Sequence, residues 1–325
     1  MVVNKMKYMK PIGGKSRMIY PKVAIITSTY NQRDKLFECL DSLKKLDYPN
    51  YKVYFMDDSG TGEIAREVKE RFPKVQVLYN ELNKGYSSSV NSLIEYSIIY
   101  DNPDYFWHID DDTEIRDKDI LKELINFAEK RTDAGILGCK VSYPNGELQW
   151  YYTDKIHFEK VPNNNIIFKE MEEARNMVRI HEVSEVIGAC FLIKRAVIDR
   201  VGMFDEGFNP AYGEESDLCM RARKRGFRCY YVGSTSIIHK QGSSLKGDSD
   251  LKWYLKKRNG IRLEWLNYPF SRILVNSFIH YGSAFRDNKV KLLWKAYKHN
   301  FNNLSEIREK RRERNENKSI FTMWI

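Results

Sequence analysis

The feature that most constrains the fold is an alternation of short apolar runs with segments whose apolar residues recur at helical spacing. Short apolar runs between turn residues are typical of buried strands, and helical segments between them are typical of crossover connections. The sequence therefore predicts an α/β protein with a mostly parallel sheet flanked by helices. Strands are predicted at residues 23–27, 51–56, 75–79, 105–109, 135–141, 184–193 and 229–232. Helices are predicted at residues 34–46, 61–72, 86–100, 117–130 and 215–225.

Composition divides the 325 residues into three predicted parts. Residues 1–21 are polar and contain Pro and Gly, which predicts an N-terminal arm. Residues 22–245 carry the alternating pattern and are expected to form the α/β domain, with an irregular loop or hairpin insertion at 146–169. Residues 246–325 are helical in pattern and basic, which predicts a helical C-terminal extension.

The net positive charge comes from the C-terminal region. The chain has a net charge of +10, and residues 241–325 hold 18 basic and 8 acidic side chains, so the rest is neutral. In this C-terminal region, residues 289–301 have an apolar stripe at helical spacing, formed by Val290, Leu293, Trp294, Tyr297 and Phe301. A basic helix of this kind can lie on an anionic membrane surface, or it can pack on the body with its lysines in solvent. We expect residues 250–325 to meet such a membrane surface and expect no nucleic-acid partner, because no nucleic-acid-binding module is recognised.

Three further observations bear on the compartment. The five Cys show no C-x-x-C spacing, which disfavours a zinc site or a disulfide framework. No apolar run approaches about 18 residues, so no transmembrane helix is predicted, and no signal peptide is recognised at the N-terminus. Together these features predict a cytoplasmic protein.

An acidic turn follows the strand predicted at 105–109. Asp110, Asp111 and Asp112 repel one another unless a cation or water separates them. Oxygen ligands in this pattern suit Mg²⁺ or Mn²⁺, and the i, i+2 spacing lets Asp110 and Asp112 point to the same side. His239 is a candidate third ligand. The competing interpretations are a solvated loop before the helix at residue 117 and a structural histidine.

Two other acidic positions have both a functional and a structural interpretation. Asp57 ends the second predicted strand, where a carboxylate can contact a ribose or a base or can cap the helix that follows. Glu214, Glu215 and Asp217 lie in the first turn of a predicted helix, where their negative charges can interact favourably with the helix dipole. A carboxylate held there can also act as a general base toward a hydroxyl.

In their order along the chain, these segments resemble a family 2 glycosyltransferase with the GT-A fold. The resemblance covers residues 22–243, about two thirds of the chain. It is carried by the first strand and turn at 23–31, by Asp57, by Asn83-Lys84-Gly85 with Asn91, and by Asp110-Asp111-Asp112. Gly188 to Phe191 followed by residues 201–206 is similar to the family's acceptor-side segment, and residues 214–221 are similar to its Glu-Asp-x-Asp-Leu-x-x-Arg motif.

The resemblance implies roles for these residues and makes 22–245 a GT-A catalytic domain. It implies metal ligation by Asp110, Asp112 and His239, and catalysis by Glu215. Glu215 stands where the family usually has Asp, so Glu214 and Asp217 are kept as alternative bases. The residues implied to bind the nucleotide are Thr27, Thr29, Tyr30, Asp57, Asn83, Lys84, Gly85, Asn91, Asp110 and Asp111.

The implied function is inverting transfer of a sugar from a UDP- or dTDP-linked donor to a hydroxyl of a glycan or lipid-linked acceptor. Mn²⁺ or Mg²⁺ is the implied cofactor, and surface polysaccharide synthesis at the inner face of the cell membrane is the implied setting. Tyr254 and Arg258-Asn259 make the chain similar to bacterial rhamnosyl- and galactofuranosyltransferases. The alternatives are a sugar nucleotidyltransferase, which needs a glycine-rich basic loop where residues 28–32 stand, and a non-catalytic module that binds nucleotide sugars.

Overall fold

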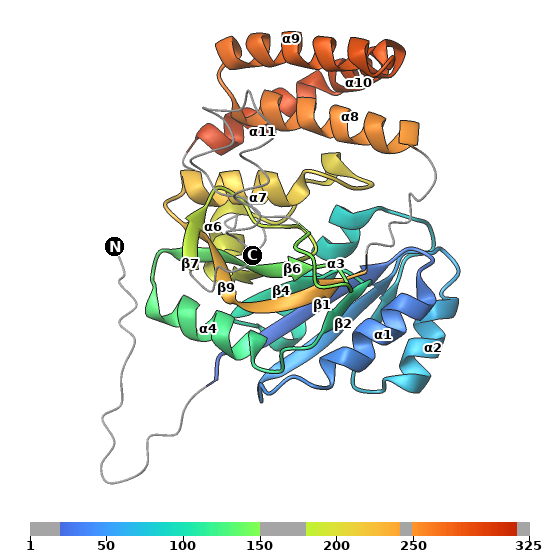
Figure 1. The fold of residues 1–325 in the computed structure, drawn as a ribbon, viewed down its shortest axis with the longest axis vertical. Coiled ribbons are helices and arrows are strands. Elements are labelled where there is room, and N and C mark those ends of the chain that lie inside the picture. The colour runs from blue at the N-terminus through green and yellow to red at the C-terminus, as the bar shows by residue number, and fades with distance from the viewer. Residues whose placement is uncertain (1–19, 150–179, 241–248, 317–325) are drawn as a thin grey trace.

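A computed structural model describes residues 20–149, 180–240 and 249–316 (Figure 1). The predicted arm at 1–21 and insertion at 146–169 lie mostly outside these residues. One mixed sheet forms the centre, with strand order β3-β2-β1-β4-β8-β6-β9-β5 and β7 paired to β9. Its strands are β1 Val23–Thr29, β2 Tyr51–Asp57, β3 Gln76–Tyr79, β4 Tyr105–Ile109, β5 Thr113–Ile115, β6 Ala134–Ser142, β7 Ile180–Val183, β8 Cys190–Lys194 and β9 Arg228–His239.

Helices cover both faces of the sheet and continue into a C-terminal group (Figure 1). The helices of the body are α1 Arg33–Leu43, α2 Glu63–Arg71, α3 Tyr86–Asp101, α4 Ile120–Lys130, α6 Arg195–Val201 and α7 Glu214–Lys224, with a 3₁₀ turn at Glu206–Phe208. The C-terminal helices are α8 Ser249–Asn267, α9 Phe270–Arg286, α10 Val290–Asn302 and α11 Leu304–Asn315. The α/β class and the helical C-terminal region are confirmed.

The direction of the strands changes across the sheet. β3, β2, β1 and β4 are parallel, as the alternating pattern predicts. β8 runs antiparallel to both β4 and β6, and β5 and β7 run antiparallel to β9. A short apolar run indicates burial and carries no information about direction, which is why the sequence does not reveal this mixture.

The predicted boundaries were wrong in the second half of the body. Of the strand expected at 184–193, only the second half forms β8, since residues 184–189 are in no strand, and the unpredicted β7 lies before that range. The strand expected at 229–232 belongs to the longer β9, whose pairing with β6 shifts register between Cys139 and Lys140. β5 and α6 were not predicted, because three and seven residues are too short for a clear periodic signal.

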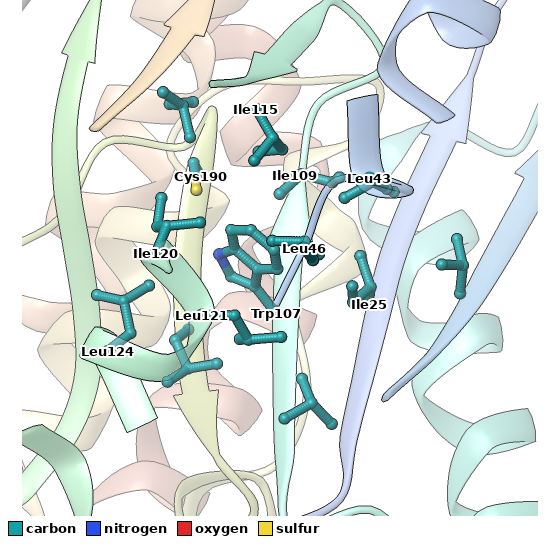
Figure 2. Packing of buried hydrophobic residues seen from close by; sticks show 14 of the residues in the cluster. Ile25, Leu43, Leu46, Trp107, Ile109, Ile115, Ile120, Leu121, Leu124 and Cys190 are labelled. Carbon is teal, nitrogen blue, oxygen red and sulfur yellow. The ribbon is translucent and has the colours of Figure 1, made fainter. Parts of the chain in front are cut away.

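The side chains of β4 alternate between two hydrophobic cores. Tyr105, Trp107 and Ile109 pack on the side of α1, α2 and α4, whereas Phe106 packs on the side of α3, α6 and α7. Figure 2 shows Trp107 among Leu121, Ile120 and Leu46. All five β4 residues are buried. Strands covered on both faces have continuous apolar sequences, which is why this strand could be predicted. The acidic turn after Ile109 is therefore attached to a strand that is packed on both faces.

The C-terminal helices are joined to the body by a small apolar cluster and by buried charges. Phe208, Leu266 and Ile307 pack together. Asp205 accepts hydrogen bonds from Arg262, at 2.9 and 3.0 Å, and from Arg314 at 3.0 Å. The division predicted near residue 245 stays a prediction, since residues 241–248 are not described. None of the helices in the described part of the chain has the length and apolar character needed to span a membrane.

Candidate active site

The acidic turn connects β4 to β5 at the carboxyl end of the parallel strands, where ligands bind in sheets of this kind. The backbone N–H of Asp110 donates to the carbonyl of Ala189 at 2.9 Å, and its carboxylate lies 3.1 Å from Nε2 of His108. Asp110 is partly exposed, whereas Asp111 and Asp112 are buried. Three carboxylates are thus held on one tight turn at the edge of both cores.

The short strand β5 brings His239 to this turn. Thr113 pairs with His239 in the antiparallel register of β5 and β9, so the His239 ring lies beside Asp112. Nε2 of His239 is 2.9 Å from Oδ1 of Asp112 and 3.9 Å from Oδ2 of Asp110. Burial lowers the pKa of His239, but its hydrogen bond with Asp112 and the neighbouring negative charges outweigh burial and raise that pKa.

Gln149 fixes the orientation of the histidine ring. Its side-chain amide donates to the backbone carbonyl of His239 at 2.9 Å, which orients the amide oxygen toward the ring. Nδ1 of His239 then donates to that oxygen at 2.6 Å. This leaves Nε2 as the nitrogen that faces the carboxylates, as in many metal sites where a second contact sets the tautomer.

Asp110, Asp112 and His239 together have the chemistry of a site for a divalent cation. One ligand atom from each lies within 4.8 Å of the other two. Two carboxylates and an imidazole suit Mn²⁺, and a cation that keeps water and phosphate ligands needs few protein groups. The residues therefore fit the metal that the sequence predicted, and metal binding by these three residues stays a prediction.

Asp111 points to the opposite side of the turn from this group. Its carboxylate accepts a hydrogen bond from the hydroxyl of Thr29 at the end of β1. Burial raises the pKa of Asp111 to about 8, with a further contribution from Asp112 and Asp110. Two of the residues predicted to bind nucleotide, Thr29 and Asp111, thus bind each other and join the acidic turn to β1.

The carboxylates at the start of α7 lie across from the acidic turn. The link between them is the segment before β8, because Ala189 accepts from Asp110 and a Cβ placed on Gly188 would be 3.4 Å from Cδ of Glu215. Burial first, and then the charges of Glu185 and Asp110, raise the pKa of Glu215 to about 7. The two acidic groups therefore share one electrostatic environment.

Glu214 is buried more deeply than a solvated cap would be. Burial and the adjacent Glu215 raise its pKa well above the usual range for a glutamate. Among the described residues, its Oε2 atom has no hydrogen-bond partner. Gly213 begins the helix in the left-handed region at φ +90°, which turns the chain sharply before the two carboxylates.

Asp217, the third candidate base, faces the C-terminal helices. Its carboxylate accepts from Arg221 at 2.8 Å and from Arg314 at 2.6 Å. Burial alone would raise the pKa of Asp217, but Arg221 and Arg314 lower it. This geometry argues against Asp217 as the base, because a paired carboxylate with a low pKa is a poor proton acceptor.

The residues predicted to hold a nucleoside lie at the ends of β1 and β2. Tyr30 is exposed, and the buried hydroxyl of Thr27 has no partner within the described ranges. Asp57 is fully buried, and its two oxygens accept from the backbone N–H groups of Ser59 and Ala65 at 3.0 and 2.9 Å. In this structure Asp57 therefore orders the start of α2, and its contact with a nucleoside stays a prediction.

The segment Asn83-Lys84-Gly85 is positioned by Asp58, whose role the sequence did not reveal. Asp58 accepts from the N–H groups of Lys84 and Gly85 at 2.9 and 3.0 Å. Asn83 and Lys84 are exposed. Asn91 is buried and holds the loop at Phe204: its side-chain amide donates to the carbonyl of Phe204 and accepts from the N–H of Phe204, each at 2.9 Å. Diphosphate binding by these residues stays a prediction, and for Asn91 the observed contacts are structural.

Two residues that contact the candidate site, Tyr86 and Gln149, were not predicted from the sequence. The ring of Tyr86 packs edge-on against His108 with 5.1 Å between ring centroids. Within the described residues its buried hydroxyl has no partner. Burial raises its pKa, and so do the charges of Asp110, Glu214 and Glu215. A lone Tyr at a helix start and a lone Gln in an irregular segment carry no motif that could have signalled these contacts.

The loop before α7 is held by α8. Asn259 donates to the carbonyls of Phe208, Ala211 and Tyr212 at 2.7, 2.8 and 2.8 Å. The guanidinium of Arg258 donates to the carbonyls of Phe208 and Asn209. The two residues noted in the sequence as Arg258-Asn259 therefore shape the approach to Glu214 and Glu215.

Comparison with known proteins places this geometry in context. The model named glycosyl transferase family 2 matches residues 24–202, more than half of the chain. The O-antigen biosynthesis protein RfbC of Myxococcus xanthus is 24% identical over 241 residues, which are 70% of this chain and 18% of that protein. An N-acetylglucosaminyl-diphospho-decaprenol L-rhamnosyltransferase of Mycobacterium tuberculosis is 25% identical over 254 residues, 71% of this chain and 78% of that one. This chain thus spans about a fifth of RfbC and most of the second relative.

Two solved structures share the fold. The mannosyltransferase PcManGT from Pyrobaculum calidifontis, in complex with GDP-Man and Mn²⁺, has a TM-score of 0.54 and 16% identity, and the match covers 88% of this chain and 76% of that one. TarS 1–349 of S. aureus, in complex with UDP-GlcNAc, has a TM-score of 0.52 and 20% identity, with 86% and 73% covered. These matches confirm the GT-A fold that the resemblance implied.

Proposed function

This chain belongs to glycosyl transferase family 2, and from that premise we propose that it transfers a sugar from a nucleoside diphosphate to an acceptor hydroxyl with inversion. The observation that carries the proposal is the position of Glu215 across the Gly188–Ala189 segment from Asp110. An inverting transfer needs a base on one side of the reacting carbon and a group that stabilises the leaving diphosphate on the other. Glu215 would be the base, and Asp110 with Asp112 and His239 would hold the cation that stabilises the diphosphate.

Glu215 acts as the base in this proposal. It takes the proton of the acceptor hydroxyl as that oxygen attacks C1 of the donor sugar. The bond between C1 and the diphosphate oxygen breaks, and its electron pair leaves with the nucleoside diphosphate. A pKa of about 7 suits the task, because the carboxylate is half ionised near neutral pH and is a stronger base than an exposed glutamate.

Glu214 supports Glu215 and is not the base itself in this proposal. Its pKa is raised well above the usual range, mainly by burial and then by Glu215. A protonated Glu214 places no second negative charge beside the base, so Glu215 can ionise at lower cost. The pair thus separates into one neutral and one ionisable carboxyl group.

On the donor side, Asp110, Asp112 and His239 would hold Mn²⁺ or Mg²⁺. The positive charge of the ion would offset the negative charge of the departing diphosphate. We place the nucleoside over the ends of β1 and β2, near Tyr30 and the unpartnered hydroxyl of Thr27. The diphosphate would then run past Asn83-Lys84-Gly85. UDP and dTDP are the proposed carriers.

The acceptor is proposed to be a glycan or a lipid-linked glycan of surface polysaccharide synthesis. The names of two relatives, one an O-antigen biosynthesis protein and one acting on a decaprenol-linked sugar, support this choice. We assign acceptor binding to the loop of residues 204–213, which Arg258 and Asn259 hold in place. A cytoplasmic location at the inner face of the cell membrane follows from such an acceptor.

The proposal is tested with the full-length protein and a panel of UDP-, dTDP- and GDP-sugars, with Mn²⁺ or Mg²⁺ present. Release of free nucleoside diphosphate is expected for at least one donor. Glu215→Gln should lower turnover by about 10²–10⁴-fold and, at saturating metal, leave the donor-induced thermal shift unchanged. Glu214→Gln is the matched variant and should lower turnover much less.

Each alternative gives a distinct result. Pyrophosphate in place of nucleoside diphosphate would identify a sugar nucleotidyltransferase. A thermal shift with a donor but no product from any donor would identify a binding module. Near-normal turnover of Glu215→Gln would show that another group is the base.

A further inference from the structure

Helix α9 packs on the protein through its polar face. Asn276 donates to Oε1 of Glu264 on α8 at 2.9 Å, and Nε2 of His280 lies 3.0 Å from the same oxygen. Lys257 of α8 donates to the hydroxyl of Ser283 at 2.9 Å. A surface helix normally turns such residues to solvent and buries its apolar stripe, so the orientation of α9 is the reverse of the usual one.

The apolar face of α9 points away from the molecule. Phe270, Phe278 and Phe285 are 71%, 80% and 77% exposed. Four further large apolar side chains of α9 are also exposed: Leu274, Val275, Ile279 and Tyr281. In Figure 1, α9 is the helix farthest from the sheet. A contiguous apolar face of this kind marks a surface that meets a partner.

The apolar surface continues onto α10. The stripe predicted for residues 289–301 is divided, because Leu293 is buried toward α8 while Trp294 and Phe301 are exposed. Trp294 and Phe301 border a groove of about 580 Å³, which Phe270 and Tyr281 of α9 also line. We call α9 together with the exposed side of α10 the outer apolar face.

The charges around the outer apolar face are almost all positive. Residues 270–302 contain six Lys and Arg and one acidic residue, Asp287. The basic residues are Arg272, Arg286, Lys289, Lys291, Lys295 and Lys298. Two of them contact α8, since Lys289 pairs with Asp250 at 3.0 Å and Lys295 lies over the ring of Tyr254. Asp287 accepts hydrogen bonds from Trp253 and Arg286 and so is already paired. The surface therefore combines an apolar centre with a cationic border and matches a partner that is apolar inside and anionic at its surface.

We propose that the outer apolar face docks onto the interface of an anionic lipid bilayer. Phenylalanines of α9 would enter the acyl boundary, Trp294 and Tyr281 would lie at the headgroups, and the flanking lysines would meet anionic phosphates. A second copy of the chain is a poorer partner. Two copies related by a two-fold axis would bring the same cationic borders together, whereas anionic lipid would attract them.

The test is vesicle flotation with the full-length protein, using phosphatidylcholine vesicles with and without 30% phosphatidylglycerol. We expect binding to the anionic vesicles that weakens at high salt. Phe278→Glu with Phe285→Glu should lower the partition coefficient at least tenfold. The matched control is Leu82→Glu with Ile99→Glu, at side chains 76% and 74% exposed on the body, and it should bind like the wild type. A cooperative thermal unfolding transition at the wild-type temperature shows that each variant is folded.

Several results would overturn the proposal. One is equal binding of the α9 variant and the wild type, and another is an equal loss in the Leu82/Ile99 control. A third is a dimer in light scattering that the α9 variant dissociates without any vesicle binding by the wild type, which would make a second copy the partner. Because none of these measurements uses turnover, the inference stands or fails separately from the proposed glycosyl transfer.

Discussion

A divalent cation bound beside Asp110 should lower the pKa of Glu215. In the metal-free protein that pKa is raised to about 7 by burial first and then by the charges of Glu185 and Asp110. A cation neutralises the contribution of Asp110 and adds positive charge nearby. The carboxylate form of Glu215 is then favoured, so the midpoint of its titration moves to lower pH.

The size of the shift follows from the separation of the two groups. The two groups meet at the segment of Gly188 and Ala189, and Asp110 is one of the charges that raise the pKa of Glu215. A unit charge at about 10 Å, in an effective dielectric constant of about 20, changes a pKa by about one unit. For a doubly charged ion at such a distance we therefore expect a fall of about two units.

The assay is ¹³C NMR titration of labelled glutamate carboxyl groups, with Mg²⁺ chosen because it is diamagnetic. Glu215→Gln assigns the signal. Asp110→Asn should lower the midpoint before Mg²⁺ is added and should reduce the further effect of Mg²⁺. Linkage requires the reciprocal result: at pH 8, Glu215→Gln should bind Mg²⁺ about tenfold or more weakly than the wild type, and Glu182→Gln on the surface should not.

Two results would refute the reasoning. A Glu215 midpoint near 4.5 in the metal-free protein would show that the site is not the desolvated environment described here. A midpoint near 7 that Mg²⁺ leaves unchanged at saturation would show that the cation binds elsewhere. The second result would remove the support for a shared site even if each group were essential for activity.

Three further changes have defined expectations. Asp205→Ala removes the buried carboxylate that Arg262 and Arg314 share, leaves Arg262 with Glu306 alone, and should lower the free energy of unfolding by about 3–5 kcal/mol in urea denaturation, whereas Asp199→Ala, at a partly exposed pair, should cost less than about 1 kcal/mol. Asn259→Ala removes the donor to three carbonyls of the acceptor loop and should cost about 1–3 kcal/mol, with steady-state kinetics showing a larger effect on the acceptor KM than on the donor KM. Gly85→Ala requires a side chain at φ +84°, with its Cβ 2.8 Å from Cγ of Asn209, and should cost more than about 1 kcal/mol in the same urea assay.

The first half of the fold could be predicted because its strands and helices alternate at regular lengths. β1 to β4 and their helices have boundaries within a few residues of the expected ones. Each strand there is an apolar run and each helix has a clear stripe. The second half mixes parallel and antiparallel strands with β5, which has three residues. Pairing between distant segments depends on register and direction, and neither is written in local periodicity.

In the candidate site, the types of residue could be predicted from the sequence, whereas their contacts could not. Asp110, Asp112 and His239 could be selected from chemistry and from family resemblance. Their meeting depends on the register of Thr113 with His239, which no local pattern reveals. Asp57 and Asp217 are the converse case, since their residue type suits catalysis or binding while their hydrogen bonds are structural.

Helix α9 shows why an apolar stripe alone does not identify a core. The sequence predicts membrane contact for residues 250–325, and the stripe at residues 289–301, flanked by lysines, suggests it. In the fold, Leu293 from that stripe is buried against α8, whereas α9 is exposed. What determines this outcome is Glu264 of α8, which binds Asn276 and His280 and so turns the polar face of α9 inward. This polar contact is costly to break once water is excluded, and it leaves the phenylalanines of α9 facing outward. The orientation is stable only if the polar contact outweighs the exposure of the apolar side chains, or if a partner covers them.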